Sequence, residues 1–150
     1  MAVRGIGMTQ SIYEAVGGLP TLQRVHKIFY DKIYDHPWLQ KFFDGFDQQA
    51  IEDKQTSFMG EKLGGPAYLG KPLRQVHENM YISQELADLR HEILRESLKE
   101  AEVSDELAER WLRVDSAFMQ QVIKKSIDSF YRDYQFQYKQ RIIHPKPNDL

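Results

Sequence analysis

Apolar residues recur at three- and four-residue steps along most of the chain, and alternating runs of the β type are few. This spacing is that of neighbours on one face of an α-helix, so the pattern predicts an all-α fold. Ser11 is placed to cap a short first helix that Gly17 and Gly18 end, and Pro20 suits the first turn of the next. Further helices are expected over about 21–34, 38–43, 48–62, 83–101 and 104–133.

The chain of 150 residues is expected to form a single domain over 1–150, because it shows no internal repeat. The core of this domain is expected over about 11–133. Beyond it, the segment at about 134–150 loses the regular apolar stripe and contains two prolines. We interpret this segment as a frayed extension of the last helix followed by a tail.

Composition removes several classes of function. The formal net charge is −2 and no basic stripe is present, which argues against nucleic acid as a partner. There is no cysteine, so disulfides, zinc–cysteine sites and cysteine-held iron–sulfur clusters are excluded, and a transition metal would have to use histidine or carboxylate. The start of the chain lacks the apolar core of a secretory signal, and no apolar run is long enough to cross a membrane. A cytoplasmic protein is expected.

Three polar side chains stand out against apolar surroundings. A glycine- and proline-rich segment carries His77 among apolar neighbours that include Leu73 and Met80. On two helical segments upstream, Tyr30 and Gln55 each occupy a face that is otherwise apolar. One imidazole opposite two hydrogen-bonding side chains in an apolar pocket indicates a heme site for a diatomic gas.

The motifs SIYEAVGG, FYDKIYDHPWLQKFF, KQTSFM, LGGPAYLG and LRQVHENMYI together resemble those of the truncated hemoglobins, over about residues 11–130. The resemblance implies a two-over-two helical sandwich that encloses heme b, iron protoporphyrin IX. It also implies that the segment bearing the proximal ligand is mostly loop. One large group of the family carries tryptophan at the position that aligns with Arg90, and this chain does not. The sequence therefore favours group I, the protozoan and cyanobacterial type.

By this resemblance, His77 falls on the proximal iron ligand, where a neutral imidazole donates its lone pair to the metal. Phe43 falls on the phenylalanine that stacks against the porphyrin, and Phe42 lies beside it. Phe58 and Met59 match bulky positions that shape or gate the ligand path. The other cofactor contacts expected are Tyr68, Leu73, Met80 and Arg90.

Tyr30 and Gln55 fall on the two distal polar positions of the family. Ile51 occupies the position where many globins carry a distal histidine, so the donors to a bound gas are expected to be Tyr30 and Gln55. Such a hydrogen bond contributes about 1.5–3 kcal/mol and strengthens dioxygen binding more than that of carbon monoxide. The expected ligands are dioxygen, nitric oxide and carbon monoxide.

Arg90 and the remaining histidines have less direct interpretations. Arg90 lies in the apolar arc of its helix and needs an anion or a water-filled pocket; a heme propionate, a distal hydrogen-bond network and escape to solvent are all open. His26 is interpreted as a helix-edge residue outside the distal pocket, and His91 as an edge histidine with satisfied hydrogen bonds. His36 is expected in a surface turn and His144 in the tail.

Two functions share this expected site. The favoured one is binding of dioxygen for storage, transport or sensing. The alternative is a heme enzyme that performs nitric oxide dioxygenation or peroxidase-type chemistry, which requires a reductase or another electron donor; no catalytic residue is assigned. A heme-free helical interaction module is the third class. A monomer or weak homo-oligomer is expected.

Overall fold

The computed structural model describes residues 10–134 and 140–150. Over these residues the chain is helical and forms no β-strand, which confirms the predicted all-α class. The expectation about the start of the chain falls on residues 1–9, outside the described part. The elements are α1 (Ile12–Val16), α2 (Leu19–Asp35), the 3-10 helix η1 (Leu39–Phe43), α3 (Gln48–Lys62), α4 (Leu73–His77), α5 (Gln84–Glu100), α6 (Asp105–Met119) and α7 (Ile127–Tyr134).

Capping residues fix where the helices begin. A side-chain oxygen accepts a backbone N–H in the first turn of α1, α3, α5 and α6, which satisfies one of the unpaired donors there. Gly17 ends α1 with a φ of 112°, and a Cβ at this position would lie 2.5 Å from the Thr21 hydroxyl. Both observations agree with the predicted first two helices. The capping residues are Ser11, Asp47, Ser83 and Ser104.

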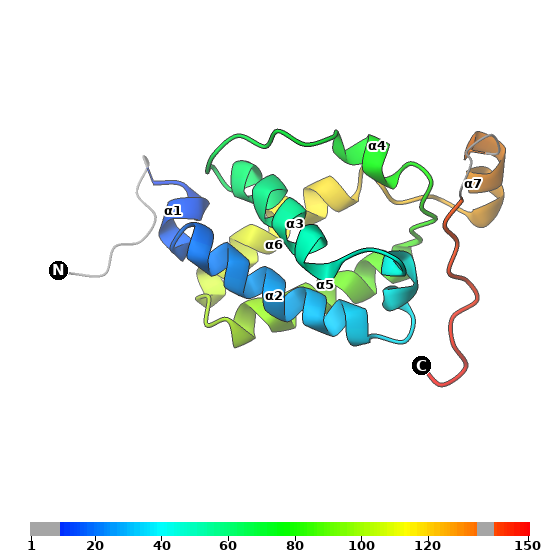
Figure 1. Cartoon of the computed structure of the whole chain (residues 1–150), viewed down its shortest axis with the longest axis horizontal. Helices are drawn as coiled ribbons and strands as arrows, with labels where there is room; N and C mark the ends of the chain where they lie inside the picture. Colours follow the sequence, from blue (N-terminus) through cyan, green and yellow to red (C-terminus); the bar gives the residue numbers. More distant parts are fainter. Residues whose placement is uncertain (1–9, 135–139) are drawn as a thin grey trace.

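The long helices form two layers. In Figure 1, α2 and α3 lie in front of α5 and α6, and α4 is a short turn above them. Contacts join α2 to α3, α2 to α5 and α5 to α6, so the two layers share one core. Burial of these apolar side chains is the main stabilising contribution. The most completely buried members of the core include Leu22, Val25, Phe29, Trp38, Leu94, Leu98 and Trp111.

The prediction of one continuous helix over 104–133 is wrong. Helix α6 ends at Met119 and α7 begins at Ile127. The apolar stripe continues through this break, but the backbone leaves the helix because the Lys124 N–H donates to the Ile82 carbonyl oxygen at 2.8 Å. The Ser129 N–H then donates to the Ser126 hydroxyl at 3.0 Å and helps to begin α7. A tertiary contact thus overrides the local period.

The expected frayed extension of the last helix falls on residues 135–139, outside the described part, and the tail expected after it is packed against the protein. The Arg141 N–H donates to the Asn79 carbonyl at 2.7 Å, and the Tyr81 N–H donates to the Arg141 carbonyl at 2.9 Å. Farther on, the Trp38 indole N–H donates to the buried Ile143 carbonyl at 2.8 Å. The end of the chain is therefore packed against the segment that follows α4, as Figure 1 shows at the right. In the described chain no helix is long and apolar enough to cross a membrane.

His26 is not at a helix edge, contrary to the sequence interpretation. It lies on the core face of α2 with 1% of its surface exposed, and its Nδ1 is 2.7 Å from the Thr56 hydroxyl on α3. Burial, with a smaller contribution from the charge of Arg90, lowers the pKa of His26 to about 3. The native protein consequently holds this imidazole neutral at mildly acidic pH.

This neutral imidazole gives a prediction about acid stability. Below pH 6.5 the unfolded chain protonates His26 while the native chain does not, so the unfolded state binds more protons and stability falls as pH falls toward 3. The contribution of this one group is up to about 1.4 kcal/mol for each pH unit. In His26→Gln that contribution is absent. Urea unfolding from pH 7 to pH 4 should therefore show a flatter pH dependence than in the wild type; parallel curves would contradict the assignment.

Candidate functional site

A cavity of about 230 Å³ lies between the two helical layers, with the α4 segment on one side of it. All the site residues expected from the sequence line this one cavity, although they come from α2, η1, α3, α4, α5 and the loops. The fold therefore brings them together, while their individual roles stay predictions. They are Tyr30, Phe42, Phe43, Ile51, Gln55, Phe58, Met59, Tyr68, Leu73, His77, Met80 and Arg90.

His77 stands at the last residue of α4, which is barely more than one turn long. Its Nδ1 lies 2.8 Å from the Leu73 carbonyl oxygen, which can only accept, so Nδ1 carries the proton and Nε2 keeps its lone pair. Among the described residues nothing hydrogen-bonds Nε2. Burial lowers the pKa of His77 against the opposing effect of the Leu73 bond, with further lowering by nearby cations. The result is a neutral imidazole with one uncommitted nitrogen.

The short α4 segment is held in place by a lysine that the sequence analysis missed. The Lys124 ammonium donates to the carbonyl oxygens of His77 at 3.1 Å, Met80 at 2.9 Å and Val122 at 3.0 Å. These bonds join the turn that carries His77 to the connection between α6 and α7. Nothing in the sequence distinguishes Lys124 from a surface lysine, because its partners are backbone groups far away in the chain.

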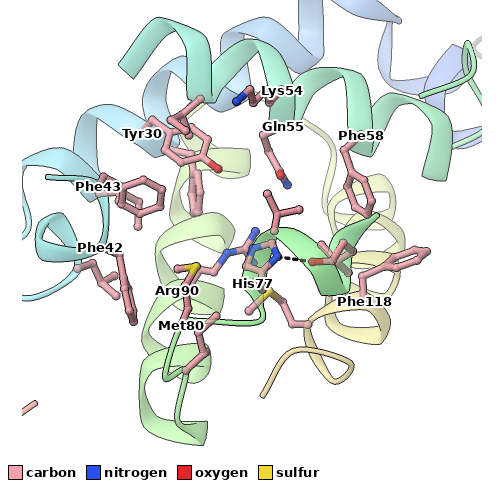
Figure 2. A pocket seen from close by; sticks show the side chains of 18 of the residues that line it. Tyr30, Phe42, Phe43, Lys54, Gln55, Phe58, His77, Met80, Arg90 and Phe118 are labelled. Carbon is pink, nitrogen blue, oxygen red and sulfur yellow. Dashed lines mark hydrogen bonds between the residues drawn. The ribbon is translucent and has the colours of Figure 1, made fainter. Parts of the chain in front are cut away.

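Tyr30 and Gln55 lie on the other side of the cavity, and Figure 2 shows both side chains pointing into it opposite His77. The Tyr30 ring is 5% exposed and meets Phe29 and Phe43 edge to face, with ring centroids 4.8 and 5.8 Å apart. Burial raises the pKa of Tyr30, which keeps the phenol protonated and able to donate. Within the described chain neither side chain has a hydrogen-bond partner. Two unpaired donors in an apolar cavity are suited to a polar ligand atom.

Arg90 finds its counter-ion within the protein. The guanidinium makes two bonds to Asp115 on α6, from Nη1 to Oδ2 at 2.6 Å and from Nη2 to Oδ1 at 3.1 Å. The side chains are 18% and 3% exposed, and the Arg90 guanidinium lies over the Phe29 ring at 5.2 Å. Escape to solvent is therefore the wrong interpretation, and the anion that Arg90 needs is Asp115. The sequence analysis missed this pair because its members lie on different helices.

Three other histidines, His26, His36 and His91, have hydrogen-bond partners outside the cavity. His26 does not line it. His91 has Nδ1 and Nε2 each 3.3 Å from a partner, the Ser116 hydroxyl and the Arg95 guanidinium, which agrees with a satisfied edge histidine. His36 accepts two backbone N–H bonds at the start of η1. Residues that line the cavity without having been expected include Phe46, Lys54, Asp115, Phe118, Met119 and Arg141.

Comparison with known proteins accounts for this arrangement. A family model described as bacterial-like globin matches residues 11–131. The chain belongs to the bacterial-like globin family. It is therefore a heme globin of the kind that binds diatomic gases, and the predicted resemblance to truncated hemoglobins is confirmed.

Individual relatives agree on the group and the fold. The chain is 36% identical over 74 residues to the group 1 truncated hemoglobin GlbN of Mycolicibacterium paratuberculosis, a match that covers 49% of this chain and 54% of that protein. It is 33% identical over 97 residues to the group 1 truncated hemoglobin of Tetrahymena pyriformis, covering 64% of this chain and 80% of the relative. The crystal structure of the Tetrahymena pyriformis protein superposes with a TM-score of 0.72 at 29% identity, over 77% of this chain and all of that one. The expected group I type and globin sandwich are thus confirmed.

The buried pair beside the cavity gives a stability prediction. Asp115→Asn would leave the Arg90 guanidinium buried without a counter-ion, which is expected to lower the free energy of unfolding by about 3 kcal/mol. The matched control is Glu109→Gln, which breaks the exposed pair between Arg95 and Glu109 on the same two helices. That pair should contribute less than about 1 kcal/mol. Urea unfolding measures the free energy of unfolding of both variants. Equal losses of stability would show that the buried pair contributes no more than the exposed one.

Proposed function

We propose that the globin cavity holds heme b with His77 as the proximal iron ligand, and that it binds dioxygen on the side of Tyr30 and Gln55. The observation that carries this proposal is the opposition of His77 to these two side chains across one apolar cavity. The imidazole is neutral with a free nitrogen, and the phenol and amide are unpaired.

The chemistry of the lining residues fits heme. Within the described part of the chain, no group of three or more His, Cys, Asp or Glu side chains is placed to hold a bare metal ion. A metal held by His77 alone would need its other ligands from a macrocycle. The walls suit a flat apolar ring, because Phe42 and Phe43 from η1 and Phe58 from α3 face the cavity.

Heme supplies an iron centre at which a diatomic gas binds. The protein contributes the hydrogen bonds around that gas. The Tyr30 phenol stays protonated because burial raises its pKa, and its ring is supported by Phe29 and Phe43, so its hydroxyl is a fixed donor. Gln55 adds an amide N–H from α3, and Ile51 offers none. Dioxygen would carry more negative charge than carbon monoxide when bound. Hydrogen bonds from these donors would therefore strengthen the binding of dioxygen more than that of carbon monoxide.

We confine the proposal to binding. Nitric oxide dioxygenation and peroxidase-type turnover would use the same hydrogen bonds from Tyr30 and Gln55. They would also require a source of electrons. The features described here, a histidine ligand and two hydrogen-bond donors, bear on ligand retention. Carbon monoxide and nitric oxide are expected to bind at the same place as competitors of dioxygen.

The role of His77 is tested by His77→Gly. The variant should lose the five-coordinate reduced heme spectrum, because it removes the only nitrogen ligand proposed, and added imidazole should restore that spectrum. The control is His91→Ala, which removes a histidine that lies outside the cavity. Absorption spectra of the reduced and carbon monoxide forms provide the measurement. A normal reduced spectrum in His77→Gly without imidazole would mean that another side chain holds the iron.

The role of Tyr30 is tested by Tyr30→Phe, which removes the hydroxyl and keeps the ring. Dioxygen release should become about tenfold faster or more, since the lost bond is worth about 1.5–3 kcal/mol, while carbon monoxide release should change far less. The matched control is Tyr34→Phe on the same helix, because the Tyr34 hydroxyl donates to the Phe46 carbonyl at 3.0 Å. Stopped-flow ligand displacement measures both rates. Equal acceleration for the two gases would refute a hydrogen bond from Tyr30.

A further inference from the structure

The described end of the chain returns to the cavity after the family match has finished. The globin match covers residues 11–131, and Arg141 lies ten positions beyond it. The backbone of Arg141 is fixed by bonds on both sides, from its N–H to the Asn79 carbonyl at 2.7 Å and from the Tyr81 N–H to its own carbonyl at 2.9 Å. Its side chain lines the cavity. This chain therefore adds a cation that the matched segment does not contain.

The Arg141 guanidinium lies at the solvent-facing rim. It is over the Phe46 ring at 4.8 Å and the Phe42 ring at 5.9 Å; Phe46 is 49% exposed whereas Phe42 is buried. Burial lowers the pKa of Arg141, but a guanidinium stays charged at neutral pH. Contact with the two rings holds the guanidinium at this rim.

Arg141 has no anionic partner in the described protein. None of the described carboxylates forms an ion pair with it, and none of the described groups accepts a hydrogen bond from its side chain. The segments outside the description, 1–9 and 135–139, contain no Asp or Glu at all. By contrast, the other arginine that lines the cavity, Arg90, is satisfied by Asp115.

Three cations lie around His77. Arg90 and Arg141 line the same cavity, and the Lys124 ammonium donates to the His77 carbonyl oxygen. Asp115 offsets the charge of Arg90, and Lys124 donates to three backbone carbonyl oxygens in all. The charge of Arg141 is left to attract an anion that enters the cavity.

We propose that Arg141 binds a carboxylate of the cofactor, so that the C-terminal extension helps to retain heme. Heme carries two propionates, which belong at the solvent edge because charged groups are costly to bury. A guanidinium donates two parallel N–H bonds to a carboxylate, and Arg141 lines the cavity beside the exposed Phe46 with its backbone held in place. This inference rests on the proposed heme site and concerns one of the two propionates.

The experiment compares two hemes and two proteins. Natural heme and heme dimethyl ester, whose propionates are uncharged, are each loaded into the wild type and Arg141→Gln. Transfer of the heme to excess apomyoglobin is followed by absorbance. We expect Arg141→Gln to lose natural heme about fivefold faster than the wild type, and both proteins to lose the diester at the same rate. High salt should shrink the difference for natural heme.

Two further variants control for charge and for packing. Lys146→Gln removes a positive charge from the same extension, but Lys146 pairs with Glu85 and does not line the cavity, so heme loss should stay at the wild-type rate. Arg141→Lys keeps the charge and should restore part of the retention.

The outcomes separate this proposal from the one before it. If Arg141→Gln speeds the loss of both hemes equally, Arg141 acts by packing on its two rings and the proposal is wrong. It is equally wrong if neither rate changes. Both results leave the reduced spectrum of the wild type normal, whereas failure of the His77 assignment would appear as a normal reduced spectrum in His77→Gly without imidazole.

Discussion

The ion pair between Arg90 and Asp115 is the interaction on which the cavity depends. It joins α5 to α6 beside the pocket. Burial lowers the pKa of His26 and of His77, and the positive charge of Arg90 adds to both effects. A globin cavity needs apolar walls, yet it must keep an imidazole neutral and a phenol protonated. Burial does most of this, and a cation held in place by its own carboxylate adds to the effect on the imidazoles without leaving a net charge in the core.

The second constraint is that His77 stands on a helix too short to be stable alone. One turn of helix leaves most of its backbone groups without internal partners. Later parts of the chain supply the missing hydrogen-bond partners. Lys124, between α6 and α7, donates to the carbonyls of His77 and Met80, and Arg141 pairs with the backbone on either side of Met80. A loop-like segment can thus hold His77 in a fixed position, because residues that are distant in sequence supply its missing bonds.

The difference between local and long-range contacts explains what the sequence could predict. Helices with a capping residue and a regular apolar face, such as α3 after Asp47 and α5 after Ser83, were found to within a residue or two because their causes are local. The resemblance to the truncated hemoglobins then identified the expected site residues, and all of them line one cavity. The break after Met119, the burial of His26 and the partner of Arg90 were missed or misread. Each depends on a contact between separate helices, which periodicity does not contain.

The C-terminal extension is the clearest case. Its composition suggested a loose tail, since prolines and polar residues interrupt the apolar pattern. Its order comes instead from two backbone bonds of Arg141, from the bond that the Trp38 indole N–H donates to the Ile143 carbonyl, and from burial of Ile143 against the rest of the protein. The two backbone bonds of Arg141 pair the extension with the segment that follows His77, so the extension and the turn that carries His77 are ordered together. A change that loosens one should loosen the other, because the bonds between them are shared.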